Sequence, residues 1–520
     1  MPHLVNLILK PEEAACEQTI RKISADKLKI SDSRISDLRI VKRSVDARQR
    51  NIKINLSVEI ITVDEPPPPG PEPFHSTDVA GNEEVIIVGA GPAGLFAALR
   101  LIELGFRPVI LERGKEISAR KKDIARISRE HIVDPDSNYC FGEGGAGTFS
   151  DGKLYTRSKK RGDNRRVLEL LCLHGADGKI MYESHPHLGT DKLPAIIKNI
   201  RKSITDAGGL YFLEKKVTDL IIEGSSVKGV IVSGDEKFLS SNVILAPGHS
   251  SRDIADICRR RGVRMEMKSF AMGVRIEHPQ EIIDRMQYHG QPGGSYLPAA
   301  AYSFVKQVDG RGVYSFCMCP GGFIVPSATS QEEVVVNGMS PSQRNSRWAN
   351  SGVVVEIRPE DLAGFSLYGE FAGLQFQKEL ERDAWIHGGS TQRAPAQRMT
   401  DFILGKTSSS LPDVSYFPGV TSSPLHQWLP YSIGHRLREG LRLAGSAMKG
   451  YLTEEAVILG VESRTSSPVR IPRDQATMEH TGISGLYPCG EGSGYSGGIV
   501  SSAVDGIRAA EAIAAKHGMI

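Results

Sequence analysis

Glycines at a fixed spacing dominate residues 85–113, VIIVGAGPAGLFAALRLIELGFRPVILER. Gly89 allows a tight turn, Gly91 lets the backbone approach a pyrophosphate, and Gly94 lets a helix pack closely on the preceding strand. Glu112 lies roughly 20 residues further on, where a carboxylate can accept hydrogen bonds from an adenosine ribose. These residue types at this spacing predict a dinucleotide-binding site.

The residues around these glycines predict the elements that such a site requires. An apolar run at 85–88 predicts a buried strand, 95–104 has the period of a helix that ends at Gly105, and 108–111 predicts a second strand. The pyrophosphate would lie at the start of the helix, where unpaired N–H groups and the helix dipole favour an anion. Both strands, the helix and Glu112 follow one another at the spacing of a nucleotide-binding unit. This spacing favours dinucleotide binding over an ordinary glycine-rich turn.

A second glycine-rich stretch covers residues 138–154, NYCFGEGGAGTFSDGKL. Glycines interleaved with Ser, Thr and Asp suit a backbone that lies against a ligand and donates N–H groups. The alternative is a mobile surface loop, but Phe141, Phe149 and Leu154 would be unfavourable in a solvated segment. A ligand-contacting loop is the preferred interpretation.

Two later turns resemble the first one in composition. A predicted strand at 242–245 runs into Ala246-Pro247-Gly248, and it would close the parallel sheet beside the first turn. Residues 485–499, GLYPCGEGSGYSGGI, join another strand to a helix predicted from Ile499 to Lys516. This turn again places glycines and a carboxylate at the start of a helix, so its N–H groups could face a second polar part of the same cofactor.

The order of predicted elements divides the chain into domains. Residues 1–65 predict a small α+β domain, and residues 66–82 a proline-rich linker. Residues 83–264 and 471–520 predict one Rossmann-type domain, and residues 265–470 an inserted α+β substrate or cap domain. The predicted fold class is therefore α/β, with a nucleotide-binding domain, an inserted domain and a small N-terminal domain.

Four apolar runs within the inserted segment, at 313–320, 322–325, 333–336 and 353–357, predict an antiparallel sheet. Such a sheet would cover the reacting face of a cofactor and shape a substrate pocket.

Catalytic residues are harder to identify from the sequence. Arg275, His278, Arg464, Arg470 and Glu143 are candidate acid–base or anchoring groups for a substrate. No pair among them has a diagnostic spacing, so a structural role is an open alternative for each of them.

Two cysteines form a separate candidate. Cys317 and Cys319 occupy alternate positions on a predicted strand, which places them on one face. A redox-active pair needs an activated thiolate that the sequence does not display, so buried inert thiols are the preferred interpretation. No closely spaced ligand set predicts a metal site.

Composition narrows the class of protein. The chain has 520 residues, 24% of them charged, and a net charge of +3, so we expect no nucleic acid or membrane as a partner. A basic cluster at 157–166 could hold a phosphate-bearing substrate, a nicotinamide dinucleotide or RNA, but a solvated surface is the simpler interpretation. Seven scattered cysteines, no signal peptide and no membrane-spanning run predict a cytoplasmic protein.

Together these stretches resemble a family of FAD-dependent dehydrogenases and oxidoreductases that has been defined mainly by sequence similarity. The family is expected to comprise two-domain, glutathione-reductase-like flavoproteins with a single dinucleotide-binding fold. The resemblance spans nearly the whole chain. The motifs that carry it are GAGPAGLFAA (89–98), YCFGEGGAGTFSDGKLYTR (139–157), VILAPG (243–248), FAMGVRIEHP (270–279), FCMCPGG (316–322), ESRTSSPVRI (462–471) and YPCGEGSGYSGGIVSSAVDG (487–506).

The resemblance implies FAD as the cofactor, with NADH or NADPH as a candidate electron donor. Val217 would flank the adenine through its backbone, and Gly490-Glu491 would contact the region between pyrophosphate and ribityl chain. The residues expected to bind the cofactor are Gly89, Gly91, Pro92, Ala93, Gly94, Glu112, Arg113, Gly145, Ala146, Ser150, Gly152, Lys153, Val217, Ala246, Gly248, Gly490, Glu491, Gly497, Gly498 and Ile499.

Two positions depart from the common flavoprotein pattern. Glu491 replaces an aspartate and is one methylene longer, although it remains an acceptor. Pro247 replaces the commoner threonine of an Ala-Thr-Gly turn, which removes a hydroxyl and an N–H group.

Two functions follow from the sequence. The first is an FAD enzyme that transfers a hydride or electrons between bound FAD and a small organic substrate. The second is a flavin-binding protein whose N-terminal domain docks a macromolecule, with flavin redox serving as a switch or in RNA modification. The sequence predicts neither the substrate nor the oligomeric state.

Overall fold

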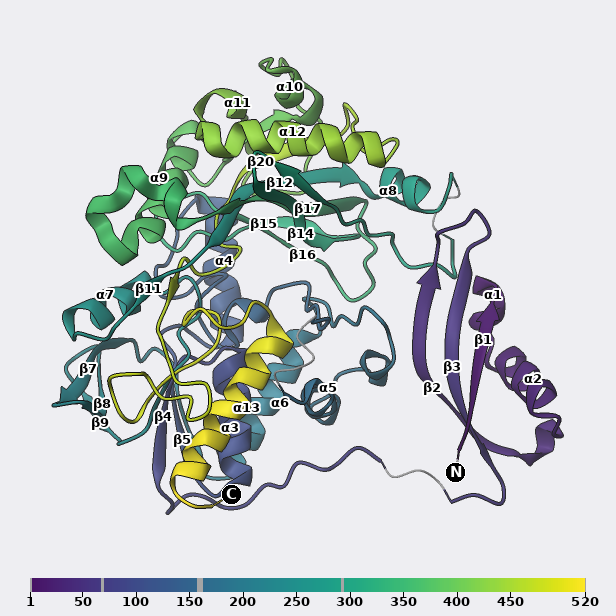
Figure 1. Cartoon of the computed structure of the whole chain (residues 1–520), viewed down its shortest axis with the longest axis horizontal. Coiled ribbons are helices and arrows are strands. Elements are labelled where there is room, and N and C mark those ends of the chain that lie inside the picture. Colours follow the sequence, from purple (N-terminus) through teal and green to yellow (C-terminus); the bar gives the residue numbers. More distant parts are fainter. Residues whose placement is uncertain (1, 67–69, 157–161, 291–293, 520) are drawn as a thin grey trace.

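The computed structural model describes residues 2–66, 70–156, 162–290 and 294–519. Figure 1 shows a small N-terminal unit beside a larger body, in which a parallel sheet with its helices lies below a second sheet with helices above it. Residues 67–69 of the predicted linker and residues 157–161 of the basic cluster lie outside the described residues.

The N-terminal unit packs two helices on one face of an antiparallel sheet with the order β1-β3-β2. Its elements are β1 (His3–Leu9), α1 (Pro11–Ala14), α2 (Glu17–Leu28), β2 (Ile35–Asp46) and β3 (Lys53–Thr62). The unit contacts the larger body through Arg43, whose backbone N–H donates to the Tyr182 carbonyl at 2.8 Å. The Arg43 guanidinium also pairs with Glu183 at 2.8 Å.

The nucleotide-binding part is a parallel sheet with the order β22-β10-β4-β5-β6. Its strands are β4 (Glu84–Val88), β5 (Arg107–Leu111), β6 (Leu210–Phe212), β10 (Val243–Leu245) and β22 (Leu486–Pro488). The helices of this part are α3 (Pro92–Glu103), α4 (Ile117–Glu130), α5 (Asn164–Leu173), α6 (Leu193–Asp206), α7 (Arg252–Arg260) and α13 (Ile499–Lys516).

Strand alternation gives this sheet two buried faces. Ile87 and Ile110 pack with α3, α6 and α13. Ile86 and Val109 pack on the other face with α7 and an antiparallel sheet of β7 (Val217–Glu223), β8 (Ser226–Val232) and β9 (Lys237–Leu239). The near-continuous apolar runs of these strands are explained by burial on both faces.

The cap is built on a sheet with the order β13-β14-β17-β12-β20-β18-β19. Its strands are β12 (Phe270–Pro279), β13 (Val305–Val308), β14 (Arg311–Cys319), β17 (Trp348–Ile357), β18 (Ala394–Arg398), β19 (Val420–Ser422) and β20 (Val457–Glu462). The helices are α8 (Gln280–Gln287), α9 (Ala372–His387), α10 (Met399–Leu404), α11 (Leu425–Trp428) and α12 (Tyr431–Ala447). A short ribbon of β11 (Glu266–Met267) and β21 (Val469–Arg470) lies where the chain enters and leaves the cap.

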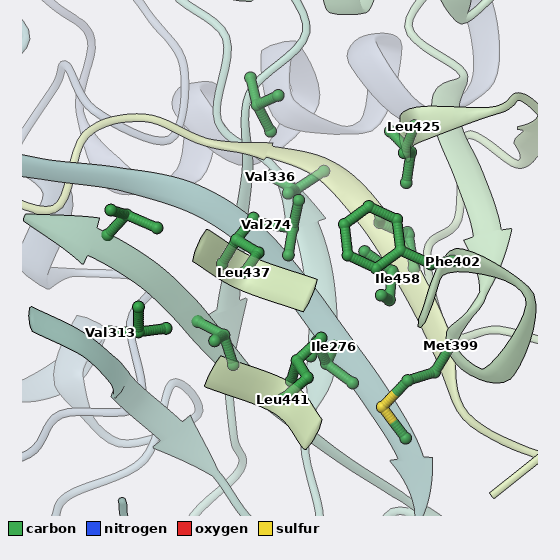
Figure 2. Packing of buried hydrophobic residues seen from close by; sticks show 14 of the residues in the cluster. Val274, Ile276, Val313, Val336, Met399, Phe402, Leu425, Leu437, Leu441 and Ile458 are labelled. Carbon is green, nitrogen blue, oxygen red and sulfur yellow. The ribbon is translucent and has the colours of Figure 1, made fainter. Parts of the chain in front are cut away.

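Apolar side chains fasten α12 to this sheet. Figure 2 shows Leu437 and Leu441 of α12 lying over Val274 and Ile276 of β12, with Val313 of β14 beside them. All five side chains are fully buried. Burying each such side chain stabilises the fold by roughly 1.5–3 kcal/mol, so the upper face of the cap sheet is a rigid core.

The prediction of a single antiparallel sheet from four runs is partly wrong. Residues 313–320 and 353–357 fall in β14 and β17 of the large sheet, but β15 (Phe323–Pro326) and β16 (Val336–Met339) form a separate two-stranded sheet. The reason is a tight turn after β14. Gly321 has a φ of +51°, and a Cβ there would lie 1.8 Å from the Arg344 carbonyl oxygen. This turn leads the chain out of the large sheet.

Other local expectations differ by small amounts. The helix expected from Pro11 is divided into α1 and α2, because the backbone at Cys16 is extended. Within the described ranges, no helix combines the length and the apolar character needed to cross a bilayer.

Candidate functional site

A cavity of about 610 Å³ lies where the parallel sheet meets the cap. On the sheet side it follows the carboxyl ends of β4, β5 and β10, marked by Val88, Leu111 and Ala246. On the cap side it is closed by Phe316 of β14 and Glu462 of β20. Ligands of such sheets bind at the carboxyl ends of the strands, and the volume is typical of cofactor and substrate sites. The cavity is therefore the candidate functional site.

The first turn passes so close to the end of β10 that it requires glycine. Gly89 has a φ of +104°, and a Cβ there would lie 2.4 Å from the Ala246 carbonyl oxygen. A Cβ on Gly94 would lie 2.0 Å from the Gly89 carbonyl oxygen, so α3 approaches the turn only without a side chain at this position. A Cβ on Gly91 would meet no atom within 4 Å, and Gly91 lines the cavity. The backbone at Gly91 is thus open to a ligand.

Two helices begin at the cavity. α3 begins at Pro92 after Gly91, α13 begins at Ile499 after Gly498, and all four residues line the cavity. The two helices lie side by side (Figure 1). The unpaired N–H groups and the dipole at each N-terminus favour an anionic or polar ligand group. The cavity can therefore bind a ligand that is anionic at two places.

The carboxylate of Glu112 joins three backbone segments at the edge of the cavity. Its Oε2 accepts from the Ala90 N–H at 2.9 Å, and its Oε1 accepts from the N–H groups of Gly114 at 3.0 Å and Gly142 at 2.9 Å. These bonds connect the first turn, the segment after β5 and the second glycine-rich stretch. The sequence predicts a ribose ligand at this position, whereas the structure gives Glu112 a positioning role that the sequence did not predict.

Arg120 of α4 holds the glycine-rich loop in place. Its side chain is fully buried, and its guanidinium donates to the carbonyl oxygens of Asn138, Tyr139, Glu143 and Gly145 at 2.7–2.9 Å. Burial lowers the pKa of Arg120 to about 10, which leaves the group charged at neutral pH. A planar cation with five donors suits several carbonyls of one loop. The loop is a fixed wall of the cavity.

A buried cluster of charges lies behind the cap-side wall. Arg464 pairs with Glu333 at 2.8 Å and with Glu381 at 2.9 Å, and Arg252 pairs with the same carboxylates at 2.8 and 2.7 Å. Burial alone would lower the pKa of Arg464, but Glu381 and Glu333 raise it, so the group stays charged. Arg464 lines the cavity, and its position is fixed by these partners.

Uncharged polar groups line the cavity beside Arg464. Burial lowers the pKa of His249 to about 4 and raises the pKa of Glu491 to about 8, although Lys268 opposes the latter shift. Both groups are therefore neutral at pH 7. Within the described part of the chain, the hydroxyls of Ser250 and Thr465 have no hydrogen-bond partner, and both residues line the cavity. Because buried polar groups are rarely left unpaired, these hydroxyls are placed to bond a ligand.

Every residue predicted to bind the cofactor lines the cavity except Gly94, which lies behind the first turn. Of the five candidates for acid–base or anchoring groups, Arg464 lines the cavity and the other four do not.

The roles expected of Arg275 and His278 are corrected by their partners. Arg275 is fully buried, and its Nε pairs with Glu462 Oε2 at 3.0 Å. His278 is also fully buried, and its Nε2 lies 2.9 Å from the Tyr451 carbonyl oxygen. Because burial lowers the pKa of His278 to about 4, the imidazole is a neutral part of the core.

The roles expected of Glu143 and Arg470 are corrected too. Glu143 Oε2 accepts from the N–H group of Ile117 at 3.0 Å, so this buried carboxylate bonds the start of α4. Arg470 lies on the surface with its guanidinium 5.6 Å from the centre of the Tyr495 ring. Neither side chain reaches the cavity.

Some functional residues were not predicted from the sequence. His249 and Ser250 directly follow Gly248 at the end of β10, so their position after a sheet strand was an available signal. Arg120 lies among other charged residues of α4, and nothing in the sequence distinguishes it from them.

The described part of the basic cluster is paired with carboxylates. Arg165 is exposed and pairs with Glu169 at 2.9 Å, whereas Arg166 is largely buried and pairs with Glu103 at 2.8 Å. Among the described residues, no group of three or more His, Cys, Asp or Glu side chains is placed to hold a metal ion. All seven cysteines are free.

Three segments of the chain match models of known protein families, and one relative matches nearly the whole chain. A family described as "FAD-dependent protein, C-terminal domain-like" matches residues 269–465, and an "FAD binding domain" matches residues 82–127. Residues 1–61 match a domain of unknown function. A protein of Clostridium beijerinckii, described as uncharacterized, is 40% identical over 535 residues, which cover 98% of each chain.

Two other matches are more distant. The tRNA uridine 5-carboxymethylaminomethyl modification enzyme MnmG of Alkaliphilus metalliredigens is 28% identical over 172 residues, which cover 32% of this chain and 24% of that protein. The crystal structure of CtdE in complex with FAD matches at 13% identity, covering 83% of this chain and 84% of that chain with a TM-score of 0.31.

The predicted fold class is confirmed, because the FAD-binding match falls on β4, α3 and β5 of the Rossmann-type sheet. The residues of the cavity fit FAD. Gly91 leaves its backbone open, two helix N-termini meet the ligand space, and Ser250 and Thr465 offer unpaired hydroxyls.

Replacing Arg120 by lysine keeps the charge but provides a single ammonium group for the carbonyls of four residues. We expect the Tm to fall by several degrees and the Kd for FAD to rise by about tenfold, because buried carbonyls lose their donors. Thermal unfolding and flavin-fluorescence titration measure the two effects. Arg126→Lys is the matched control, since Arg126 lies on the exposed face of the same helix and pairs with Glu130. Equal behaviour of the two variants would contradict this role of Arg120.

Proposed function

The chain belongs to the family of FAD-dependent proteins that it shares with the Clostridium beijerinckii relative, and from this premise we propose that it is an FAD-dependent oxidoreductase. In this proposal, electrons pass as a hydride or singly between bound FAD and a small organic substrate. The observation that carries the proposal is the cavity between the Rossmann-type sheet and the cap.

The sheet side of the cavity would hold the FAD. Gly89 and Gly91 would let the pyrophosphate approach the start of α3, and Glu112 would orient the first turn. The start of α13 at Ile499 would face the pyrimidine end of the flavin, where N–H groups favour a negative charge. FAD itself supplies the electron-accepting chemistry, and the protein supplies orientation and electrostatics.

The substrate would bind between the cap wall and the residues that follow β10. Arg464 presents a fixed positive charge, and His249 is neutral, so the imidazole could donate or accept a hydrogen bond without adding charge. Ser250 and Thr465 add unpaired hydroxyls. This set suits a small polar or anionic substrate held beside the flavin. Of the five sequence candidates, Arg464 is therefore kept as a substrate-binding group, and His249 is added to it.

Three finer points belong to the same proposal. NADH or NADPH would supply electrons, and the kinship with two-domain, glutathione-reductase-like flavoproteins rests on the single dinucleotide fingerprint at Gly89–Gly94. Free cysteines support a reducing, cytoplasmic setting.

RNA modification is not favoured, because the match to MnmG covers 24% of that protein.

Glu491 gives this proposal a pH test. Burial raises the pKa of Glu491 to about 8, so the carboxyl is protonated at neutral pH and ionises above pH 8. A carboxylate formed beside the FAD pyrophosphate would repel it, so we expect the Kd for FAD to rise up to about tenfold per pH unit above pH 8. Glu491→Gln should remove this dependence, whereas exposed Glu223→Gln should keep it. A flat profile in the wild type would contradict the assignment.

The function itself is tested by the absorption spectrum of the purified protein, followed anaerobically while NADPH or NADH is added. We expect absorption bands at about 375 and 450 nm from an oxidised flavin, and we expect these bands to bleach when the nucleotide is added. Bands that persist would exclude a nicotinamide donor.

Other outcomes distinguish the two functions. Absence of the bands after incubation with FAD would contradict the proposal. The second function, a flavin-binding protein that docks a macromolecule, predicts two other results. The protein would retain flavin without turnover, and deleting residues 1–65 would abolish binding of a macromolecular partner.

A further inference from the structure

Two cysteines of β14 meet one lysine of the glycine-rich loop at the cap-side wall of the cavity. Lys153 Nζ lies 3.5 Å from Cys317 Sγ and 3.6 Å from Cys319 Sγ. Cys317 lines the cavity, whereas Cys319 is fully buried. Asp151 Oδ2 lies 3.7 Å from the same Nζ. The ammonium group of Lys153 therefore lies close to both sulfurs, and Cys317 is open to the cavity.

The backbone at Cys317 has a conformation that cysteine rarely adopts. Its φ is +49°, and the pairing of β14 with β17 shifts by one residue between Phe316 and Cys319. Arg275 stabilises this bulge, because its Nη2 donates to the Cys317 carbonyl oxygen at 3.2 Å. Bulges and left-handed non-glycine residues persist where the surrounding structure fixes them, and they are concentrated at functional sites.

Both sulfurs approach the same nitrogen. The two Sγ atoms lie 3.5 and 3.6 Å from Lys153 Nζ, and Cys319 Sγ lies 3.4 Å from the Cys317 carbonyl oxygen. Residues two apart in a strand are separated by roughly 6.6 Å, which is within the Cα range of about 4.4–6.8 Å that a disulfide can span.

The charges around the pair favour one thiolate and one thiol. Hydrogen bonding from Cys319, with the charges of Lys153 and Arg275, holds the pKa of Cys317 well below its usual range, although burial opposes this shift. The same hydrogen bond and burial raise the pKa of Cys319 well above its usual range. The titratable groups that face the pair are Lys153, Asp151, Arg275, Glu462 and Glu491.

We propose that Cys317 and Cys319 form a redox-active dithiol that exchanges two electrons with the flavin. The inference rests on the proposed function, because it requires FAD in the cavity. A single nucleophilic thiolate would not explain the second sulfur beside the same ammonium group. The alternative of inert buried thiols does not explain the exposure of Cys317 to the cavity.

The exchange balances within the pair and the flavin. When the dithiol is oxidised, the Cys317 thiolate and the Cys319 thiol form an S–S bond and release one proton and two electrons. The oxidised flavin takes up the two electrons and one proton. In the opposite direction, the reduced flavin cleaves the disulfide and regenerates the thiolate and the thiol. Lys153 stabilises the thiolate of the reduced pair.

The electron capacity of the flavin-loaded protein tests this proposal. The protein is oxidised with diamide, freed of reagent and titrated anaerobically with dithionite, with the flavin absorbance as readout. We expect the wild type to take up about four electrons per flavin, two for the flavin and two for the pair. Cys317→Ser and Cys319→Ser should each take up about two. Cys172→Ser is the control and should behave like the wild type, because Cys172 lies on α5 outside the cavity.

Peptide mass spectrometry of the diamide-treated protein gives an independent readout. We expect a disulfide between Cys317 and Cys319 that disappears after dithionite. Uptake of two electrons by flavin-loaded wild type, or absence of the disulfide, would overturn the dithiol while leaving the proposed function intact. Failure to bind flavin would contradict the proposed function itself, and the flavin exchange with it.

Lys153 gives a second test that does not use activity. Lys153→Met should slow the alkylation of Cys317 by iodoacetamide at pH 7 on the order of tenfold, because the thiolate fraction falls. Lys153→Arg should restore much of the rate, since it keeps the positive charge. Lys228→Met, at an exposed position of strand β8, is the matched control. Equal rates in the wild type and Lys153→Met would show that no stabilised thiolate exists and would overturn the proposal.

Discussion

The cavity depends on two buried ionic groups that bond the backbone of its walls. Glu112 accepts N–H groups from the first turn and from the glycine-rich loop, and Arg120 donates to carbonyl groups of the same loop. A glycine-rich loop has a high conformational entropy in the unfolded chain, and it forms a defined surface only if its polar groups are bonded. The carboxylate and the guanidinium provide those bonds from behind, which leaves the front of the loop free for a ligand.

The two walls of the cavity have different physical characters. The sheet side offers backbone N–H groups and helix N-termini, which suit a dinucleotide with little regard to side-chain identity. The cap side offers fixed side chains, among them Arg464, Thr465 and Cys317. The rigid core beneath α12 supports this wall (Figure 2).

The sequence predicted the elements that carry local signals. The glycine spacing at Gly89–Gly94 and the apolar period of Ile499–Lys516 depend on near neighbours in the chain, and α3 and α13 were predicted correctly. Side-chain roles were predicted less well. Arg464 and Arg470 are similar in the sequence, yet Arg464 meets buried carboxylates of the loop before β16 and of α9, whereas Arg470 reaches the surface. Spacing along the chain contains no information on such distant contacts.

The strand order of the parallel sheet has a consequence for how the protein is made. β22 pairs with β10, and α13 packs against α3, although more than two hundred residues separate β10 from β22 along the chain. During synthesis, the edge of β10 and one side of α3 stay uncovered until residues 486–516 have emerged. The nucleotide-binding sheet therefore matures after the cap has been translated.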